Sequence, residues 1–516
     1  MSSTFMGLET ARRGLFTQQS ALYTTGQNVA NASTPGYSRQ RVNFAQTEPY
    51  PGVGMNMPQL PGQMGTGVKA ESVQRIRESF LDVQYRGENN KLGYWQTRSD
   101  ALSKMESIMN EPSDSGLSTV MDQFWQSLQD LAVDPTNAGA RSVVRQRGTA
   151  VTDTFNYLSN SLSAVKRDQK DQVDVTVKEI NSVVYQLDQI NKQIGSVEPH
   201  GLLPNDLYDE RDRLIDQLSS LVNVKVDYVK SGGNADPKAE GNAEIKLVDD
   251  NGSELGVLLS VAGSNKVSVN YKGVDDSVNT LTVGAESIDF SKVNSSGKLR
   301  ALIESYGYEK NGQATGVYPD MLNELDNMAF TFAKQFNDVH ASGLSPNEIS
   351  AGRSEDIPFF SDGDNNTFGA RSGFASRIAV SQSIKDSLDY IATASGGDPS
   401  TATLGDASNA RALADVINQP FDYGQNSQQA DFRNYYQNVI GGMGVLSQEA
   451  TRLSANSSTL QQSVDQKRQS VSSVSLDEEM TNMIQFQQAY NASARMITIQ
   501  DEMLDKIING MGTGGR

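Results

Sequence analysis

The chain has 516 residues, no cysteine, two histidines, and 44 basic against 62 acidic side chains, which gives a net charge of −18. Without cysteine there is no disulfide framework, no thiolate nucleophile and no metal site built on sulfur. Two imidazoles exclude a multi-histidine metal centre, and the acidic balance argues against nucleic-acid binding. No apolar run approaches the roughly 18 residues of a membrane span, and the first residues do not form a secretory signal. Taken alone, these features predict a protein that stays in the cytoplasm and does not insert into a membrane.

Apolar residues recur every seven positions near both ends of the chain. Such a repeat keeps one seam of a helix against a partner helix. We predict an assembly seam at Leu8, Leu15, Leu22, Val29, Leu476, Met483, Tyr490, Ile497 and Leu504. Residues 1–45 are net basic and residues 476–516 are net acidic, which favours pairing of the two ends, although each exposed ion pair stabilises by only ~0–1 kcal/mol. The same spacing leaves open two unrelated surface helices on a globular core.

The pattern between the two ends changes several times. Residues 49–67 are rich in Pro and Gly and predict a loop or hairpin, and residues 71 to 225 have helical periodicity. Apolar alternation and the turn sequence Asp250-Asn-Gly252 then predict a small β domain. Helical periodicity returns at 298–340 and from 406 to the end, where Leu446, Leu453 and Leu460 share a seam.

We therefore predict a mainly α chain with an inserted β domain. The N- and C-terminal helices pair as a coiled coil, a long helical rod domain follows, and a β-rich insertion is nested inside it. The predicted domains are 1–45 with 471–516, 46–223 with 297–342 and 405–470, 224–296, and 343–404, whose fold is unassigned.

Residues with catalytic or metal-binding chemistry do not form a convincing site. A structural or solvated role is favoured for His200, in a predicted turn, and for His340, at a predicted helix end. The acidic group at 206–212 could supply paired carboxylates for glycoside hydrolysis. It falls in the first turns of a predicted helix, however, where acidic side chains complement the helix dipole and Asn205 and Asp206 can cap. We expect no enzyme, no cofactor and no metal.

Three motifs resemble one family. The first is Ala30-Asn-Ala-Ser-Thr-Pro-Gly-Tyr-Ser-Arg-Gln40, with Asn31, Pro35, Gly36 and Tyr37. The second, Leu476-Asp-Glu-Glu-Met480, precedes Met483-Ile-Gln-Phe-Gln-Gln-Ala-Tyr490. These two resemble the terminal signatures of bacterial flagellar rod, hook and hook-associated proteins. The third motif contains Asn205, Asp206, Asp209, Arg211 and Asp212, and its resemblance is to the hook-associated proteins of the hook–filament junction. Ser472-Ser-Val-Ser475 departs from the family pattern, which puts a helix break at Ser473 in doubt.

The resemblance implies a structural subunit without catalysis. Such proteins leave the cell through the flagellar type III export apparatus, assemble as a ring of copies on the distal end of the hook and join it to the filament. The implied partners are further copies, the hook protein, the next junction protein (hook-associated protein 3), an export chaperone at the C-terminal helix, and the export apparatus. The implied location is therefore extracellular, and a chain without cysteine suits export in the unfolded state.

Two alternatives remain open. The chain could be another flagellar axial protein, of the hook or rod, which the motif at 205–212 argues against. It could also be a flagellar scaffold with an enzymatic or adhesive insertion at 224–404, where no residue constellation favours catalysis.

Overall fold

The computed structural model describes residues 5–51, 62–109, 116–363, 368–423 and 429–510. Its contacts divide the chain into unit 1 (1–90, 180–266 and 457–516) and unit 2 (91–179 and 267–456). Three helices contribute residues to both units: α2 (Ser79–Met109), α4 (Ala138–Val197) and α11 (Phe432–Ser472). The predicted loop at 49–67 lies partly outside the described residues.

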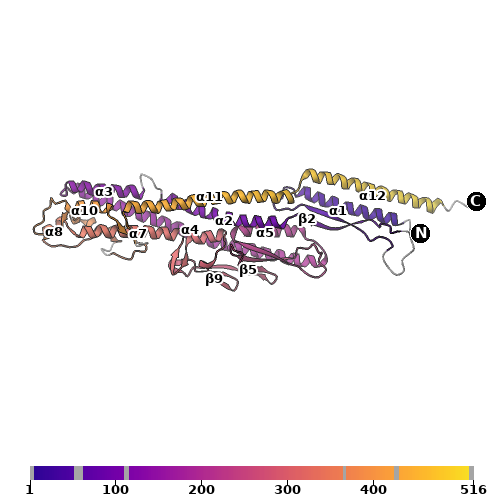
Figure 1. Ribbon diagram of the computed structural model, residues 1–516, viewed down its shortest axis with the longest axis horizontal. Coiled ribbons are helices and arrows are strands. Elements are labelled where there is room, and N and C mark those ends of the chain that lie inside the picture. Colours follow the sequence, from indigo (N-terminus) through magenta and orange to yellow (C-terminus); the bar gives the residue numbers. More distant parts are fainter. Residues whose placement is uncertain (1–4, 52–61, 110–115, 364–367, 424–428, 511–516) are drawn as a thin grey trace, which may run out of the picture. The chain divides into compact units, whose positions relative to one another are not determined.

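In unit 1 the two ends of the chain lie side by side as α1 (Phe5–Ala30) and α12 (Leu476–Gly510) (Figure 1). The helices run antiparallel, because Gly7 lies opposite Gln500 and Gly14 lies opposite Ser493. A Cβ atom on Gly14 would come within 3.1 Å of the Ser493 hydroxyl oxygen. The missing side chain therefore lets the two backbones approach closely. A break at 473–475 separates α12 from α11.

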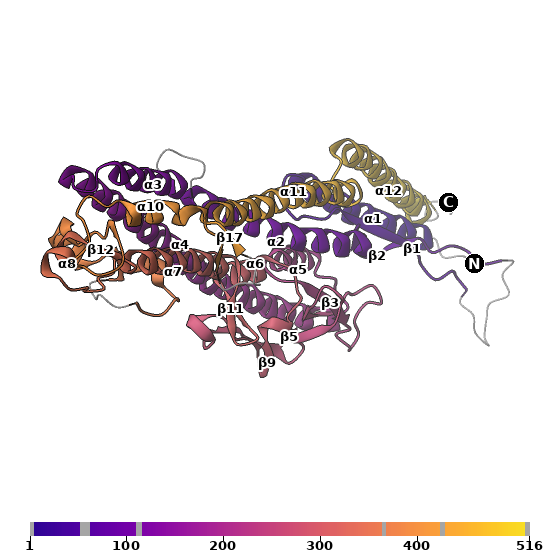
Figure 2. The same cartoon turned by 60° about the vertical axis from the view of Figure 1, so that its left-hand side comes forward.

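Strands β1 (Gln40–Gln46) and β2 (Val68–Arg75) form an antiparallel ribbon along α1 (Figure 2). The Thr17 hydroxyl donates to the Val68 carbonyl oxygen, and Phe44 meets Phe486 of α12 edge to face, with ring centres 6.0 Å apart. The helix predicted from residue 71 begins only at Ser79. The prediction was wrong over 71–78 because residues 68–75 pair their backbone with β1.

The rest of unit 1 is α5 (Asn205–Leu221) and an antiparallel sheet, together with the end of α4. The sheet order is β3 (Val224–Val229), β4 (Asn242–Val248), β5 (Glu254–Ser260), β6 (Gly263–Ser264). Asn191 is the polar break in the apolar repeat of α4. Its side chain is buried and exchanges two hydrogen bonds with the backbone of Ala243, which fixes the start of β4 on the helix. The predicted turn at 250–252 joins β4 to β5.

Unit 2 is built around an aromatic core. The predicted apolar face of α3 (Leu117–Val133) is buried there, and Phe124 packs against Phe332 and Phe336 of α7 (Val317–Ala341). The other helices are α6 (Lys298–Tyr306), α8 (Pro346–Ala351), α9 (Gln382–Asp386) and α10 (Ser408–Asp415). Short 3₁₀ helices lie at Glu198–His200 in unit 1 and, in unit 2, at Val274–Asp276, Phe290–Lys292, Phe374–Ser376, Leu388–Tyr390 and Val416–Asn418.

The strands of unit 2 form one three-stranded sheet and several pairs. The sheet is β7 (Val267–Asn270), β8 (Thr280–Val283) and β9 (Glu286–Asp289). The pairs are β10 (Tyr308–Lys310) with β11 (Gln313–Thr315), β12 (Gly343–Leu344) with β15 (Ala394–Ser395), β13 (Phe360–Asp362) with β14 (Ile378–Val380), and β16 (Phe421–Asp422) with β17 (Gln429–Ala430).

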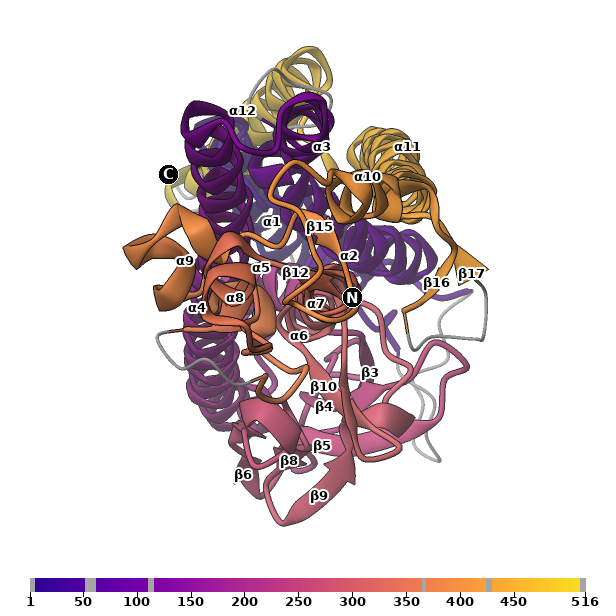
Figure 3. The same ribbon diagram turned by 90° about the vertical axis from the view of Figure 1, so that its left-hand side faces the viewer.

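The described part of 343–404, unassigned from sequence, folds onto the end of α7, where β12, β15 and α10 gather (Figure 3). Asn337 accepts hydrogen bonds from the backbone amides of Phe359 and Phe360. His340 is buried, with Nδ1 3.0 Å from the Ile357 carbonyl oxygen and Nε2 accepting from the Ala392 amide. Of the two roles that the sequence left open for His340, structural or solvated, the burial and hydrogen bonds of the side chain show the structural one.

The coarse fold prediction, a mainly helical chain containing β structure, is confirmed. Among the described residues, no helix combines the length and the apolar character that crossing a membrane requires.

Candidate functional site: a buried polar joint at the base of the terminal helices

The three family motifs, far apart in sequence, meet in unit 1 where α1 and α12 adjoin β1, β2 and α5. Asn28 is the hub on the side of the terminal helices and is almost fully buried. Its Nδ2 donates to the Gln40 carbonyl oxygen at 2.8 Å and to Oε2 of Glu479 at 3.0 Å. Its Oδ1 accepts from the Tyr37 hydroxyl and from the Gln40 amide. One amide group thus joins α1, the 31–39 loop, β1 and α12.

Arg39 adds charged contacts to the same place. Its guanidinium pairs with Glu479 at 2.7 Å and with Glu478 at 2.6 Å, and its backbone amide donates to the Ser472 carbonyl oxygen at 2.9 Å. The Glu-Glu pair of the C-terminal motif therefore fixes the start of α12 to the N-terminal motif. Arg39 bridges the break at 473–475, because its backbone amide binds Ser472 before the break and its side chain binds Glu478 and Glu479 after it.

The N-terminal loop owes its shape to local turns. The Asn31 side chain donates to the Gln27 carbonyl oxygen and accepts from the Thr34 hydroxyl, which ends α1. Pro35 is exposed, and Gly36 has a φ of +84°, a conformation that favours glycine. The reversal brings Ser38 to α5, where its amide donates to Asp209 at 3.0 Å.

Asp212 of α5 is the second hub. Its carboxylate lies 3.0 Å from Arg75, 3.1 Å from Arg77 and 3.1 Å from Arg86, which come from β2, the following loop and α2. Burial alone would raise the pKa of Asp212, but the surrounding arginines overcome this and hold it below its usual range. The side chain is therefore an anion that compensates buried cations, as such groups require.

Further charges surround Asp212 and complete the network. Asp209 binds Arg75 at 2.7 Å, although burial still raises the Asp209 pKa. Asp216 binds Arg86 at 2.8 Å and Arg468 of α11 at 2.5 Å. The network thereby joins β2, α2, α5 and the end of α11.

The predicted helix capping by Asn205, Asp206 and the acidic group was wrong. Helix α5 has no side-chain cap, and Pro204 precedes its first residue. Asn205 donates to the Val73 carbonyl oxygen and to the Gln40 side chain, and Gln40 donates to Asp206. Asp206 does lie in the first turn of α5, as predicted, but Asp209 and Asp212 form ion pairs with arginines that are distant in sequence.

Arg211 is fully buried, and sequence reasoning gave it no contact. It donates to the Gly241 carbonyl oxygen at 2.7 Å, pairs with Glu240 and lies over the rings of Tyr208 and Tyr228. The partners missed from sequence, Arg75, Arg86, Glu240 and Arg468, stand in separate segments.

The predicted seam residues lie close to the contact between α1 and α12. On α12, Met483, Tyr490, Ile497 and Leu504 are half-buried, and Leu476 is 52% exposed. On α1, Leu8, Leu15, Leu22 and Val29 are half-buried. They follow by one position the residues that approach α12 most closely, which include Gly7, Gly14 and Asn28.

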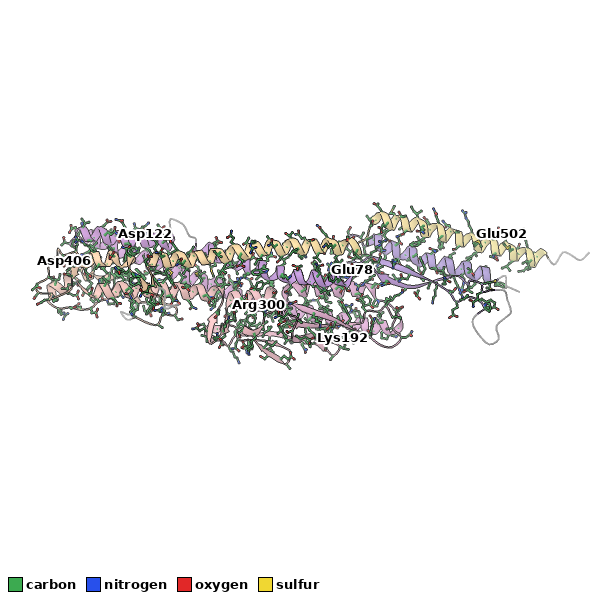
Figure 4. The ribbon with its side chains drawn as sticks, in the orientation of Figure 1. Glu78, Asp122, Lys192, Arg300, Asp406 and Glu502 are labelled. Carbon is green, nitrogen blue, oxygen red and sulfur yellow. The ribbon has the colours of Figure 1, made fainter. Side chains whose placement is uncertain are left out.

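Much of the apolar surface of both helices is uncovered. Large side chains exposed by 40% or more are Phe5, Phe16, Tyr23, Leu476, Met480, Ile484, Met496, Ile499, Met503, Ile507 and Ile508. Polar side chains such as Glu502, labelled in Figure 4, are interspersed with them. Rows of exposed apolar side chains mark surfaces that other molecules cover.

Known proteins are similar to this chain over its length. The chain is 48% identical over its whole length to flagellar hook-associated protein 1 of Bacillus subtilis, which it also covers completely. The chain belongs to the flagellar hook-associated protein 1 family. The prediction of a flagellar hook-associated structural protein is thereby confirmed.

More distant members of the family agree. The proteins of the same name from Salmonella typhimurium and Escherichia coli are 25% and 24% identical over 97% of this chain, and 98% and 99% of their own lengths are covered. Residues 102–355 match the flagellar hook-associated protein FlgK helical domain. Residues 8–37 match the flagella basal body rod protein family, and residues 465–510 match the flagellar basal body rod FlgEFG protein C-terminal family.

A solved structure shares the fold. The flagellar hook junction protein FlgK from Burkholderia pseudomallei superposes with a TM-score of 0.58 at 14% identity, covering 76% of this chain and all of that one.

Proposed function

We propose that the chain is a structural subunit that assembles on the distal end of the flagellar hook and forms the junction to the filament. The observation that carries the proposal is the buried polar joint. Family motifs from both ends and from α5 meet there, at the base of two helices whose outer faces are apolar and exposed. The contacts described in the joint are hydrogen bonds and ion pairs that connect elements of the fold, which suits a structural subunit.

The joint and the exposed faces have separate tasks. Desolvation offsets much of the attraction in a buried ion pair, so the task that we assign to the joint is to fix geometry. The joint therefore holds α1 and α12 in a fixed relation to β1, β2 and α5. The terminal helices, paired as a coiled coil within 1–45 and 471–516, line the inner tube and bury their remaining apolar faces against neighbouring copies. The rod segments 46–223, 297–342 and 405–470, with the insertions 224–296 and 343–404, lie outside that tube.

The route and the partners follow from this role. The chain is exported by the flagellar type III apparatus, after a chaperone has covered the apolar face of α12 in the cytoplasm. It then sits outside the cell between the hook protein and hook-associated protein 3. In the described part of 224–404, no group of His, Asp and Glu side chains could hold a metal ion, so we propose no added enzymatic activity.

Deletion of the gene in the bacterium that carries it tests the proposal. We expect hooks without filaments and flagellin released into the medium, both reversed by the intact gene. Normal filaments in the deletion strain would contradict the proposal.

The seam is tested by a matched pair of variants. Ile497→Asp places a charge on the half-buried face of α12 and is expected to prevent complementation, whereas Thr498→Asp, on the exposed face, is expected to restore filaments. Complementation by both would remove the seam role and leave the function standing.

A further inference from the structure

Unit 2 contains a cavity of about 700 Å³ between α2, α7 and the first turns of α11. Its floor is apolar and formed by buried side chains, namely Leu102, Met105, Met321 and Met443. Cavities of this size accommodate a ligand or the side chains of a bound segment. Methionine is unbranched and polarizable, so a floor with three of them adapts to different apolar shapes.

One carboxylate at the cavity is already neutralised. Glu304 accepts a hydrogen bond from the Tyr94 hydroxyl at 2.6 Å and pairs with Arg98 at 3.1 Å. Arg300, labelled in Figure 4, binds its other oxygen at 2.7 Å. Glu304 therefore presents no free charge to a ligand.

Two further carboxylates lack such neutralisation. Asp320 and Glu324 lie one turn apart on α7 and both line the cavity. Asp320 accepts from the Gly316 amide, and Glu324 accepts from the Tyr435 hydroxyl. In the part of the chain that the structure describes, neither forms an ion pair with lysine or arginine. Burial, together with repulsion by Glu324, raises the pKa of Asp320, so an added cation would be stabilised here.

The opposite wall lets another chain approach closely. Gly442 of α11 lines the cavity, and a Cβ atom on it would meet nothing within 4 Å. Tyr94, Tyr308 and Tyr435 supply aromatic side chains at the same cavity, which can contact a cation through a ring face. The cavity thus combines an apolar floor, aromatic walls and uncompensated negative charge.

We propose that this cavity docks a lysine- or arginine-bearing amphipathic helix of a protein partner other than this chain. The aliphatic stem of the cationic residue lies on the methionines, as long basic side chains do on apolar surface, and its charged end meets Asp320 and Glu324. Charge complementarity to Asp320 and Glu324 indicates a basic occupant. The chain's own net basic stretch, residues 1–45, already packs against α12 in unit 1, which favours a separate protein as its source. The proposal takes from the proposed function only the premise that the partner is a protein.

The test measures binding of a synthetic helical peptide, with leucine on one face and lysine on the other, to the full chain by fluorescence anisotropy. Two changes alter the cavity. Gly442→Leu fills it from a helical position with open space, where leucine favours the helix over glycine. Asp320→Asn with Glu324→Gln removes its charge but keeps hydrogen-bonding groups.

Two matched controls leave the cavity intact. Gly441→Leu adds the same side chain one residue away, where there is also open space but no cavity wall. Asp338→Asn removes an exposed charge farther along α7. We expect each cavity variant to bind the peptide about tenfold more weakly, which corresponds to the loss of one good contact. Both controls should bind it as the unaltered chain does.

Three results would overturn the proposal. One is equal binding by cavity variants and controls. Another is equal binding of a peptide with glutamate in place of lysine. The third is a dimer of the free chain that Gly442→Leu dissociates, since the occupant would then be a second copy. All three are read on the free chain, so they are independent of the filament tests.

Discussion

Asn28 of α1 donates a hydrogen bond to Glu479 of α12 at 3.0 Å, across 451 positions of sequence. The same side chain holds Tyr37 and the backbone of Gln40, so the N-terminal motif and the C-terminal motif share one buried amide. This contact fixes where the two terminal helices begin to run together.

Replacing Asn28 by alanine is expected to loosen the start of α12. The change removes the acceptor of the Tyr37 hydroxyl and of the Gln40 amide and leaves Glu479, among the described residues, with Arg39 alone, and an unsatisfied buried polar group costs about 1–3 kcal/mol. Hydrogen exchange in residues 476–486 should accelerate, and filament assembly should fall. Gln27→Ala, on the adjacent exposed side chain, should change neither. Unaltered exchange in the Asn28 variant would show that the amide does not hold the joint.

Replacing Asp212 by asparagine should destabilise unit 1 by roughly 3–5 kcal/mol, because three buried arginines lose their common anion. Because the folded-state pKa of Asp212 is depressed, its contribution is present above the unfolded pKa and is lost in acid as the carboxylate protonates. Urea unfolding at neutral pH measures the loss. Glu210→Gln removes an acid of the same motif whose one ion pair among the described residues is with exposed Arg213, and should cost about 0–1 kcal/mol. Similar losses in both variants would refute the hub role.

His340 predicts an acid-sensitive stability of unit 2. Burial lowers its pKa to about 4 from an ordinary value of 6.5. Between these two pH values, the imidazole is neutral in the folded protein and protonated in the unfolded chain. Stability should be unaffected above pH 6.5, fall between 6.5 and 4, and lose about 3 kcal/mol over that window, since one pKa unit corresponds to ~1.4 kcal/mol.

His340→Gln is the comparison that isolates this effect. Glutamine does not titrate, so the difference in unfolding free energy between pH 7 and pH 5 should shrink relative to the unaltered chain. An identical pH dependence in both proteins would assign the acid sensitivity to other groups.

Local periodicity was enough to predict much of the fold. Apolar spacing predicted helices at both ends and the buried face of α3, because burial repeats with the helix period. Composition could not show that Asn191 is a docking point for β4, since the Ala243 backbone that it binds is 52 residues away. The fold of residues 343–404 could not be predicted for the same reason. Asn337 and His340 of α7 hold this segment through hydrogen bonds to its backbone, and the local sequence does not show these contacts.

The contacts of the buried polar joint were harder to predict from the sequence than the helices. The sequence motifs marked Asn31, Tyr37, Asp209 and Asp212, but only the fold pairs the acidic residues with arginines. Acidic residues early in a helix can interact with the helix dipole or form ion pairs with distant residues. The sequence shows only the position in the helix, so it favours the dipole. The seam was predicted from its leucines for a similar reason. The apolar repeat does not show that Gly7 and Gly14, one position earlier, lie directly against Gln500 and Ser493.

The antiparallel pairing of the chain's two ends is the central claim, and a cysteine pair tests it most directly. The chain has no cysteine of its own. A Cβ on Gly14 would lie 3.8 Å from Cβ of Ser493, which suits a disulfide. In flagella assembled from the Gly14→Cys/Ser493→Cys variant, mild oxidation should join the two sites within one chain, whereas Gly26→Cys/Ser493→Cys should not react. Failure of the first pair to cross-link, or cross-linking only between chains, would contradict the account.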